Sequence, residues 1–386
     1  MRRLYNPFLY SERRFNLLTD CCTIVRRERK QTQLVKQSKR FFCISRRLGR
    51  EDQLESRSLE CDVNATVAAR RLVSQELGVI NERIQKELDR CRVGELREAS
   101  GYYFNQKGKL FRPMVALLMS RACNNVQTIS KEQQTIAMVT EMIHTATLVH
   151  DDVIDLATTR RSQPVANRLW GDRNAVLAGD FILAVSSVAL SQVNNPLVVE
   201  LMSQILDNLV KGEIMQLGTK SKSEERFMHY IDKTYKKTGS LLAHSCKSVA
   251  VLSQCDPLLC DVAFQYGRNL GIAFQLIDDM LDFISTSEVL GKPAAADLKL
   301  GLATAPVLFA SEMYPELEPM IMRRFAHRED IDWALSRVRL SDGIQKTLVL
   351  AQQYGKAAVQ SVKNLPESRE RTALEDIVED VLTRTN

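Results

Sequence analysis

Residues 141–161 read EMIHTATLVHDDVIDLATTRR and hold three aspartates, Asp151, Asp152 and Asp155. Residues three or four apart share one face of a helix, so these carboxylates crowd together and repel one another at a helix end. A solvent-exposed acidic patch would explain most isolated motifs of this kind. Here apolar residues precede and separate the aspartates, which makes a fully solvated face a poorer explanation. These apolar residues are Leu148, Val149, Val153, Ile154 and Leu156.

A second segment of the same kind lies further along the chain, where residues 271–283 read GIAFQLIDDMLDF. Its three aspartates are Asp278, Asp279 and Asp282. Two apolar, unpaired carboxylate clusters in one chain are hard to explain structurally, because a buried carboxylate needs a partner. If the two triads face each other across a helical core, they supply the oxygen ligands that Mg²⁺ prefers, completed by water and substrate phosphates. The pair of segments therefore predicts a magnesium site.

Positively charged residues accompany the acidic segments. Residues 108–113 read GKLFRP at a predicted helix start. The helix dipole disfavours cations at that end, so Lys109 and Arg112 are better explained by an anion bound between them and the helix N-terminus. Arg160 and Arg161 follow the first triad, and helix C-terminal capping alone would explain them.

The spacing of apolar residues is helical from about residue 62 onward. Apolar residues recur at intervals of three and four, as in Leu177, Phe181, Ala184 and Val188. No alternating, strand-like run with hairpin turns stands out. We therefore expect an all-α, bundle-like fold with one domain over residues 56–386. Breaks between helices are expected near residues 104–109, 124–129, 158–173, 193–197, 218–223, 286–300, 314–315 and 325–329.

The net charge is unevenly distributed along the chain. Residues 1–50 hold 14 Lys and Arg but three acids, whereas the whole chain has a net charge of +6. The remaining body is therefore mildly acidic, which argues against nucleic acid as a partner. An Arg-rich, acid-poor leader without a long uncharged core is typical of a mitochondrial transit peptide, so residues 1–55 predict import into the mitochondrial matrix. A basic tail of another purpose and plastid import are the alternatives.

The cysteines and the apolar runs bear on the cellular compartment and on membrane spans. The nine cysteines are odd in number and form no C-x-x-C pair, as expected for reduced, mostly buried thiols of an intracellular protein. Polar residues interrupt every window of about 18 residues, so we expect no membrane span. Residues 181–199 come closest to one, and they are interpreted as a buried helix and a turn.

Taken together, the motifs resemble the trans-isoprenyl diphosphate synthase family over about residues 100 to 310. Residues 151–155 and 278–282 are similar to the family's two aspartate-rich motifs, and residues 108–113 match its G-K-x-x-R-P element. The further matches, in the family's order, are Arg160-Arg161, Lys237-Thr238, Phe274-Gln275, GKP at 291–293 and ADLKLG at 296–301. The ordered set is highly specific. The leader and residues 296–325 look most like the long-chain mitochondrial members. One departure is Ser162, where the family usually has Gly after the paired arginines, and it removes no charged ligand.

This resemblance implies an isoprenoid-synthase-type helical bundle with a central active-site cavity. The implied activity is that of a long-chain all-trans-polyprenyl diphosphate synthase. Such an enzyme adds isopentenyl diphosphate head to tail to farnesyl or geranylgeranyl diphosphate, releases diphosphate and supplies the ubiquinone side chain. The implied partners are a second copy, in a homodimer, or a second, non-catalytic subunit in a hetero-oligomer. The product would be released at a membrane surface.

The resemblance also implies roles for individual residues. The six aspartates of the two motifs would hold three Mg²⁺ ions. The diphosphate of isopentenyl diphosphate would be bound by Lys109, Arg112, His144 and Arg161. The allylic diphosphate would be bound by Arg160, Lys237 and Lys292. The carbocation would be stabilised by Lys237, Thr238 and Gln275. A core histidine is the alternative for His144, and Lys237 or Lys292 taken alone would be interpreted as solvated.

Competing functions differ in their motifs. A terpene cyclase shares the first D-D-x-x-D but usually mixes Asn, Ser and Glu in its second metal motif and has no second diphosphate site. A catalytically inactive regulatory subunit tends to lose motif carboxylates, whereas this chain keeps all six. Elongation is therefore favoured, with a medium-chain synthase of the geranylgeranyl type as the nearest alternative.

Product length is predicted from the residues before the first triad. Thr147 precedes Asp151 by four residues, or roughly 6 Å along a helix. Short-chain members of the family carry bulky aromatic residues four or five positions before the motif, where they stop elongation. Here the two positions hold the small residues Thr147 and Ala146. This predicts that no side chain at these positions forms a floor that blocks the growing chain, and therefore a long product. Small residues that merely allow tight helix packing are the alternative.

Overall fold

The computed structural model describes residues 65–105, 108–124, 128–160, 163–218, 222–284 and 295–384. The predicted leader at residues 1–55 lies outside this part of the chain, as do Arg161 and Lys292. The elements of the first half are α3 (Ala65–Leu72), α4 (Ser74–Leu88), α5 (Gly94–Gly101), α6 (Phe111–Asn124), α7 (Lys131–Ile154), β1 (Thr159–Arg160), β2 (Gln163–Pro164) and α8 (Ala166–Ser191).

The second half is also helical. Its elements are α9 (Pro196–Leu217), α10 (Ser223–Thr234), the π-helical segment η4 (Tyr235–Gly239), α11 (Ser240–Leu252), α12 (Pro257–Ile284), α14 (Ala296–Lys299), α15 (Ala305–Met313), α16 (Leu317–Met322), α17 (Arg328–Leu340), α18 (Gly343–Val362) and α19 (Arg369–Thr383). The prediction of an all-α fold is confirmed for the described residues.

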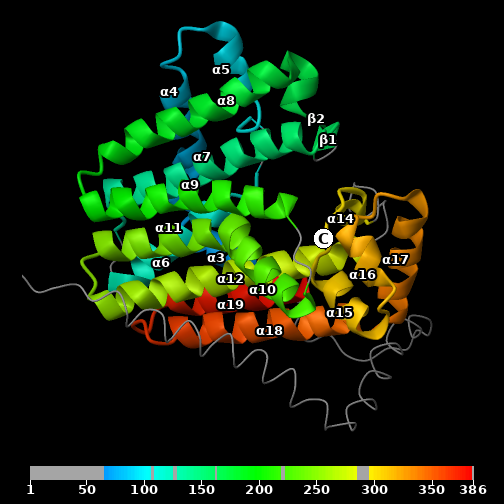
Figure 1. The fold of residues 1–386 in the computed structure, drawn as a ribbon. Helices are drawn as coiled ribbons and strands as arrows, with labels where there is room; N and C mark the ends of the chain where they lie inside the picture. The colour runs from blue at the N-terminus through cyan, green and yellow to red at the C-terminus, as the bar shows by residue number, and fades with distance from the viewer. Residues whose placement is uncertain are drawn as a thin grey trace, which may run out of the picture. The chain divides into compact units, whose positions relative to one another are not determined.

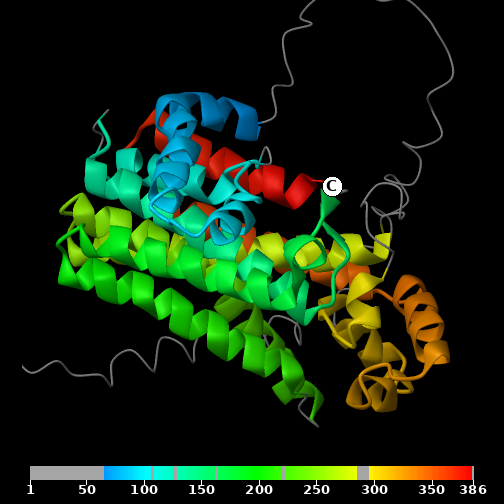
Figure 2. The same cartoon turned by 90° about the horizontal axis from the view of Figure 1, so that it is seen from above.

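The long helices run side by side in a bundle, as Figures 1 and 2 show. Helix α7 packs on α8, α11 on α9 and α12, and α12 on α18. The main core cluster is apolar throughout and draws on α4, α6, α7, α11 and α12; its members include Ile84, Leu117, Ile136, Leu242 and Leu270. Helices α14 to α17 lie at one end of the bundle, beside the C-terminal end of α12. A smaller hydrophobic core cluster, which includes Phe283 and Leu298, packs between them.

Helix α7 is fixed at its start and carries the first aspartate triad at its end. Ser130 and Gln133 form a capping box, in which each side chain accepts a hydrogen bond from the other residue's backbone N–H. The helix then runs for 24 residues through the core to Ile154, with Asp155 as its C-cap. The cap sets the start of the helix, and the buried apolar face sets its direction, so the triad reaches the end of the bundle.

Two glycines let η4 and α11 approach α12 closely. A Cβ atom at Gly271 would lie 2.6 Å from the Cα atom of Gly239, and one at Gly267 would lie 2.5 Å from the carbonyl oxygen of Leu242. Any larger side chain would force the helices apart, since the obstructing atoms belong to the backbone. This close approach places Thr238 against the segment that carries the second triad.

The structure differs from the expected break at residues 158–173. Strands β1 and β2 pair there as a short antiparallel sheet, in which Thr159 pairs with Pro164 and Arg160 with Gln163. Helix α8 begins already at Ala166 and is interrupted at Gly171, whose φ of 78° suits glycine. The break at residues 253–256 was not predicted because it contains no Gly or Pro. There Gln254 takes the left-handed conformation, with a φ of 58°.

Within the described residues, α8 is long and apolar enough to cross a membrane by length and composition. It packs closely on α7, since a Cβ atom at Gly179 would lie 2.2 Å from Nε2 of His150. Ala175, Ala178 and Ile182 on the same helix are fully buried. These contacts are those of a bundle helix.

Candidate active site

The first aspartate triad lies where α7 ends, and its central member is held by two neighbours. Asp152 is 2% exposed. Its carboxylate accepts a hydrogen bond of 2.6 Å from the hydroxyl of Tyr103 and bonds of 2.8 to 3.0 Å from the guanidinium of Arg160. Asp152 thus ties the β1–β2 sheet and the chain after α5 to the end of α7. The ion pair also fixes Arg160 beside the triad.

The other two aspartates of this triad lie in an unfavourable electrostatic environment. Burial raises the pKa of Asp151 to about 6, Lys237 opposes the shift, and the carboxylates of Glu213 and Asp155 add to it. Burial is also the first cause that raises the pKa of Asp155. A cation at this position would favour the charged form of both groups. The chemistry of the triad therefore fits a site for a positively charged ligand.

Helix α9 contributes polar residues that the sequence patterns did not single out. Glu213 Oε2 lies 2.5 Å from Lys237 Nζ, and Gln216 Oε1 accepts a hydrogen bond of 3.1 Å from the same nitrogen. Gly212 allows this approach, because a Cβ atom there would lie 2.8 Å from Lys237 Cγ. The sequence signal that could have indicated these residues is the polar pair Glu213 and Gln216, three residues apart in an otherwise apolar helix and preceded by Gly212.

The second triad has a buried central member as well. Asp279 is 3% exposed, and it accepts hydrogen bonds from the Tyr230 hydroxyl (2.5 Å) and from Gln275 Nε2 (2.8 Å). Burial raises the pKa of Asp279 to about 6, against the effect of these two bonds, and Asp278 adds to the shift. Tyr230 was not predicted as a site residue, and its local sequence carries no signal for it.

The predicted residues Thr238 and Gln275 join the two halves of the site. The Thr238 hydroxyl donates a hydrogen bond of 2.8 Å to Gln275 Oε1, so a continuous chain of bonds links η4 to Asp279. Lys233 interacts electrostatically with Asp279 and also with Glu213 and Lys237, which surround the first triad. The electrostatic interactions of Lys233 and Lys237 therefore link the two aspartate motifs.

The outer members of the second triad are engaged by other parts of the chain. Asp282 accepts hydrogen bonds from the backbone N–H groups of Ala296 (3.0 Å) and Asp297 (3.1 Å), at the start of α14. Asp278 forms an ion pair of 2.5 Å with Arg384, near the C-terminus. Within the described residues, no group of three or more His, Cys, Asp and Glu side chains is arranged to hold a metal ion.

Of the residues predicted for isopentenyl diphosphate, Lys109, Arg112 and His144 lie in the described part of the chain. Arg112 Nη1 and His144 Nε2 are 2.9 Å apart. A small cavity of about 30 Å³ is lined by His144, Arg160 and Gly108, among others. Lys109 is exposed, and its carbonyl oxygen accepts a hydrogen bond from Arg70. The structure thus brings Arg112, His144 and Arg160 together.

Ala146 and Thr147, predicted to set the product length, differ in their surroundings. Ala146 is fully buried in the main core cluster. Thr147 is partly buried, and its hydroxyl donates a hydrogen bond of 2.7 Å to the carbonyl oxygen of His144. Four residues separate Thr147 from Asp151, so both side chains lie on the same face of α7.

Comparison with known proteins decides the family. Residues 93–338 match the family model for polyprenyl synthetase. The chain belongs to the polyprenyl synthetase family. It is 52% identical over 314 residues to the all trans-polyprenyl-diphosphate synthase PDSS1 of Mus musculus, covering 80% of this chain and 76% of that protein. The family is that of prenyltransferases, so the prediction of a prenyltransferase is confirmed.

Two further matches agree with the family. Subunit 1 of the decaprenyl-diphosphate synthase of Schizosaccharomyces pombe is 42% identical over 345 residues, covering 82% of this chain and 91% of that protein. The structure of a polyprenyl synthase from Caulobacter crescentus, complexed with calcium and isoprenyl diphosphate, aligns with a TM-score of 0.77. Its sequence identity is 28%, and the match covers 84% of this chain and 100% of that one. The polyprenyl synthetase family therefore accounts for the fold.

Proposed function

We propose that this prenyltransferase is a long-chain all-trans-polyprenyl diphosphate synthase that supplies the side chain of ubiquinone. Its substrates would be isopentenyl diphosphate and an allylic primer, farnesyl or geranylgeranyl diphosphate. The observation that carries the proposal is the set of contacts that join the two motifs: Gln275 bonds both Thr238 and Asp279, and Lys237 pairs with Glu213 beside Asp151. Such a mixture of cations and carboxylates suits a diphosphate bound together with metal ions.

The aspartates fit divalent cations by the chemistry of their donor atoms. All are carboxylate oxygens, the pKa values of Asp151 and Asp279 are raised by burial, and a bound cation would relieve that cost. We propose that the six motif aspartates hold three Mg²⁺ ions together with the allylic diphosphate. Bound Mg²⁺ would stabilise the charge that develops on the departing diphosphate.

The protein's own residues would then bind, orient and shield the substrates. Arg160 and Lys237, with Lys292, would bind the allylic diphosphate, and the ion pair with Asp152 already holds Arg160 at the site. The Thr238–Gln275 pair would place oxygen dipoles near the allylic cation. Isopentenyl diphosphate would be bound by Lys109, Arg112, His144 and Arg161. Attack of its double bond on the cation and loss of a proton would complete each cycle.

An assay of the purified chain tests this function. With farnesyl diphosphate, isopentenyl diphosphate and Mg²⁺, we expect release of diphosphate and all-trans products many isoprene units long. Chromatography of the dephosphorylated products measures their length. A single twenty-carbon product would identify a medium-chain synthase instead, and a cyclic hydrocarbon would identify a terpene cyclase. Absence of turnover by the chain alone would indicate that a second subunit is required.

We also propose that the chain works as a homodimer or with a second, non-catalytic subunit. Helix α8 supports association, because Leu177 and Val188 on it are 46% and 52% exposed while the same helix buries Ile182 in the bundle. An exposed apolar stripe of this kind is typical of an association surface. Light scattering of the assayed sample would show twice the chain mass for a homodimer. The chain mass alone together with full turnover in the same sample would contradict both assemblies. The same preparation, mixed with lipid vesicles, would test product release at a membrane surface.

The N-terminal residues are proposed as a mitochondrial transit peptide, with the matrix as destination. Removal of residues 1–50 should leave a folded, active body, because the described bundle begins at Ala65. Fusion of the same residues to a fluorescent reporter should carry it into mitochondria, given their 14 basic and three acidic residues. A reporter that remains in the cytosol, or a truncated chain that fails to fold, would contradict this assignment.

A further inference from the structure

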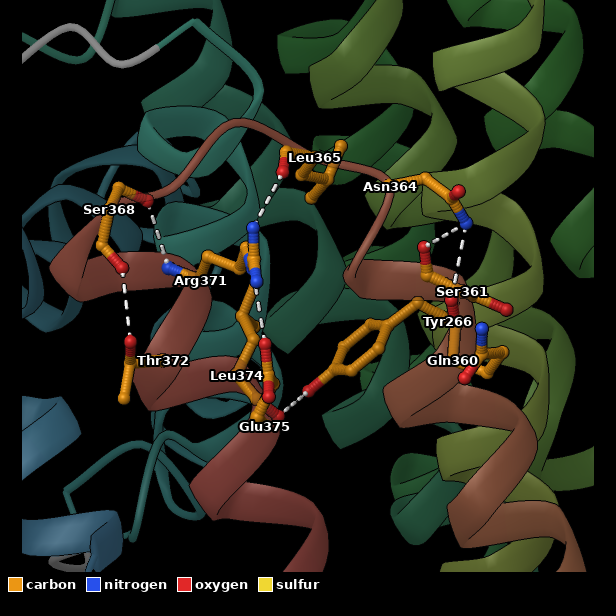
Figure 3. A network of polar contacts seen from close by, with 10 residues as sticks. All are labelled: Tyr266, Gln360, Ser361, Asn364, Leu365, Ser368, Arg371, Thr372, Leu374 and Glu375. Carbon is orange, nitrogen blue, oxygen red and sulfur yellow. Dashed lines mark hydrogen bonds and ion pairs between the residues drawn. The ribbon is translucent and has the colours of Figure 1, made fainter.

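Helix α19 runs beside α12 in the same direction, with a register that is fixed at its start. The hydroxyl of Ser368 caps α19 by accepting a hydrogen bond of 3.0 Å from the backbone N–H of Arg371 (Figure 3). The hydroxyl of Tyr266 on α12 donates a bond of 2.7 Å to the carbonyl oxygen of Leu374. About ten residues further along each helix, or roughly 15 Å, this register brings Arg384 beside the second aspartate motif.

Three separate contacts hold the guanidinium of Arg384 at that motif. It lies 2.5 Å from Asp278 Oδ1 and donates a hydrogen bond of 2.8 Å to the carbonyl oxygen of Phe274. Its central carbon lies 3.7 Å from the centroid of the Phe274 ring, which suits a cation–π contact. The ring of Phe274 in turn packs on Phe111, at the start of the helix that carries Arg112. Arg384 thus contacts the second motif directly and the first turn of α6 through the Phe274 ring.

Capping of the end of α19 does not require these contacts of the Arg384 side chain. The side chain of Arg384 is 18% exposed, whereas that of Asp278 remains 44% exposed. A long cationic side chain loses rotamer entropy when it is fixed, so a mostly buried position needs specific partners. The partner at hand is a carboxylate that the proposed function assigns to a metal ion.

We propose that Arg384 takes the place of a divalent cation at Asp278 in the metal-free enzyme and leaves when metal binds. The inference rests on the proposed function, because it requires Asp278 to be a metal ligand. A guanidinium 2.5 Å from Asp278 Oδ1 and a divalent cation bound to the same carboxylate repel each other, and both draw on the lone pairs of that oxygen. The C-terminal turn of α19 is therefore a strap that closes the second motif without metal and opens with it.

Metal affinity measured without substrate tests the strap. We expect Arg384→Ala in the full chain to bind Mg²⁺ about 2- to 5-fold more tightly by calorimetry, the range set by loss of a partly exposed ion pair. Arg371→Ala is the matched control. It lies on the same helix and pairs with Glu375 and with the Leu365 carbonyl, so it should lower thermal stability and leave Mg²⁺ affinity unchanged.

Hydrogen exchange provides a second readout that does not depend on a substitution. Addition of Mg²⁺ to the wild-type chain should speed exchange of the amides of residues 380–384 and leave residues 370–375 unchanged. Equal or weaker Mg²⁺ affinity in Arg384→Ala, or slower exchange at residues 380–384, would overturn the strap while leaving the metal site intact. If Asp278→Ala binds Mg²⁺ as well as wild type, the metal assignment itself fails and the strap fails with it.

Discussion

Asp151→Ala is expected to lower turnover by at least about 10³-fold, the scale of losing a principal electrostatic contact to the reacting group. Asp151 is largely buried at the end of α7, with Glu213 and Asp155 as like charges and Lys237 as the opposing cation. Removal of its carboxylate leaves Lys237 and Glu213 in place but takes away a proposed metal ligand. Steady-state kinetics with saturating substrates and Mg²⁺ measure the loss.

The fold of this variant should survive. Loss of a buried, partly protonated carboxylate relieves repulsion and creates only a small cavity, so circular dichroism should show unchanged helical content. Asp207→Ala on α9 is a suitable control, since Asp207 is exposed and pairs with Lys211 at 2.5 Å, and its turnover should stay near wild type. Asp278→Ala should lose activity on the same scale as Asp151→Ala. Near-normal turnover in either motif variant, or full activity in excess EDTA, is incompatible with the metal assignment.

Sequence alone could predict the fold class and the motif residues because their signals are local. Asp151 and Asp155 are four residues apart, as are Asp278 and Asp282, and each pair is embedded in an apolar helix. Spacing of this kind fixes which side chains share a helix face, whatever the rest of the chain does. The apolar periodicity likewise predicted the bundle, because each long helix must bury a continuous stripe.

Other residues of the site could not be found in this way, because tertiary packing brings them there. Tyr230 reaches Asp279 from α10, and Arg384 reaches Asp278 from the position directly after α19. Neither position has a neighbour pattern that distinguishes it from an ordinary helical Tyr or Arg. Only the register between α19 and α12, fixed by Tyr266, places Arg384 at the motif. The break between helices at residues 253–256 was missed for a similar reason. Gln254 takes a positive φ there, which the local sequence does not indicate.

The second large effect concerns product length, which is expected to fall in Thr147→Phe. Thr147 lies one turn before Asp151 on the same face of α7 and is partly buried. A chain anchored by its diphosphate at the triad must run past this position as it grows, so an aromatic ring there should block it. We expect products several isoprene units shorter, with the first condensations little affected. Chromatography of the dephosphorylated products measures the shift.

Thr147→Val is the matched control for this variant. Valine keeps the volume of threonine and removes the hydroxyl that donates to the His144 carbonyl, so the product length should not change. Ala146→Tyr should also shorten the product. Because Ala146 is fully buried in the core, however, the larger ring should also cost about 1–3 kcal/mol of stability. Thr147→Phe is therefore the cleaner test, since a partly buried position has room to accept the ring. An unchanged length distribution in both Thr147→Phe and Ala146→Tyr would place the floor of the elongation path at another side chain.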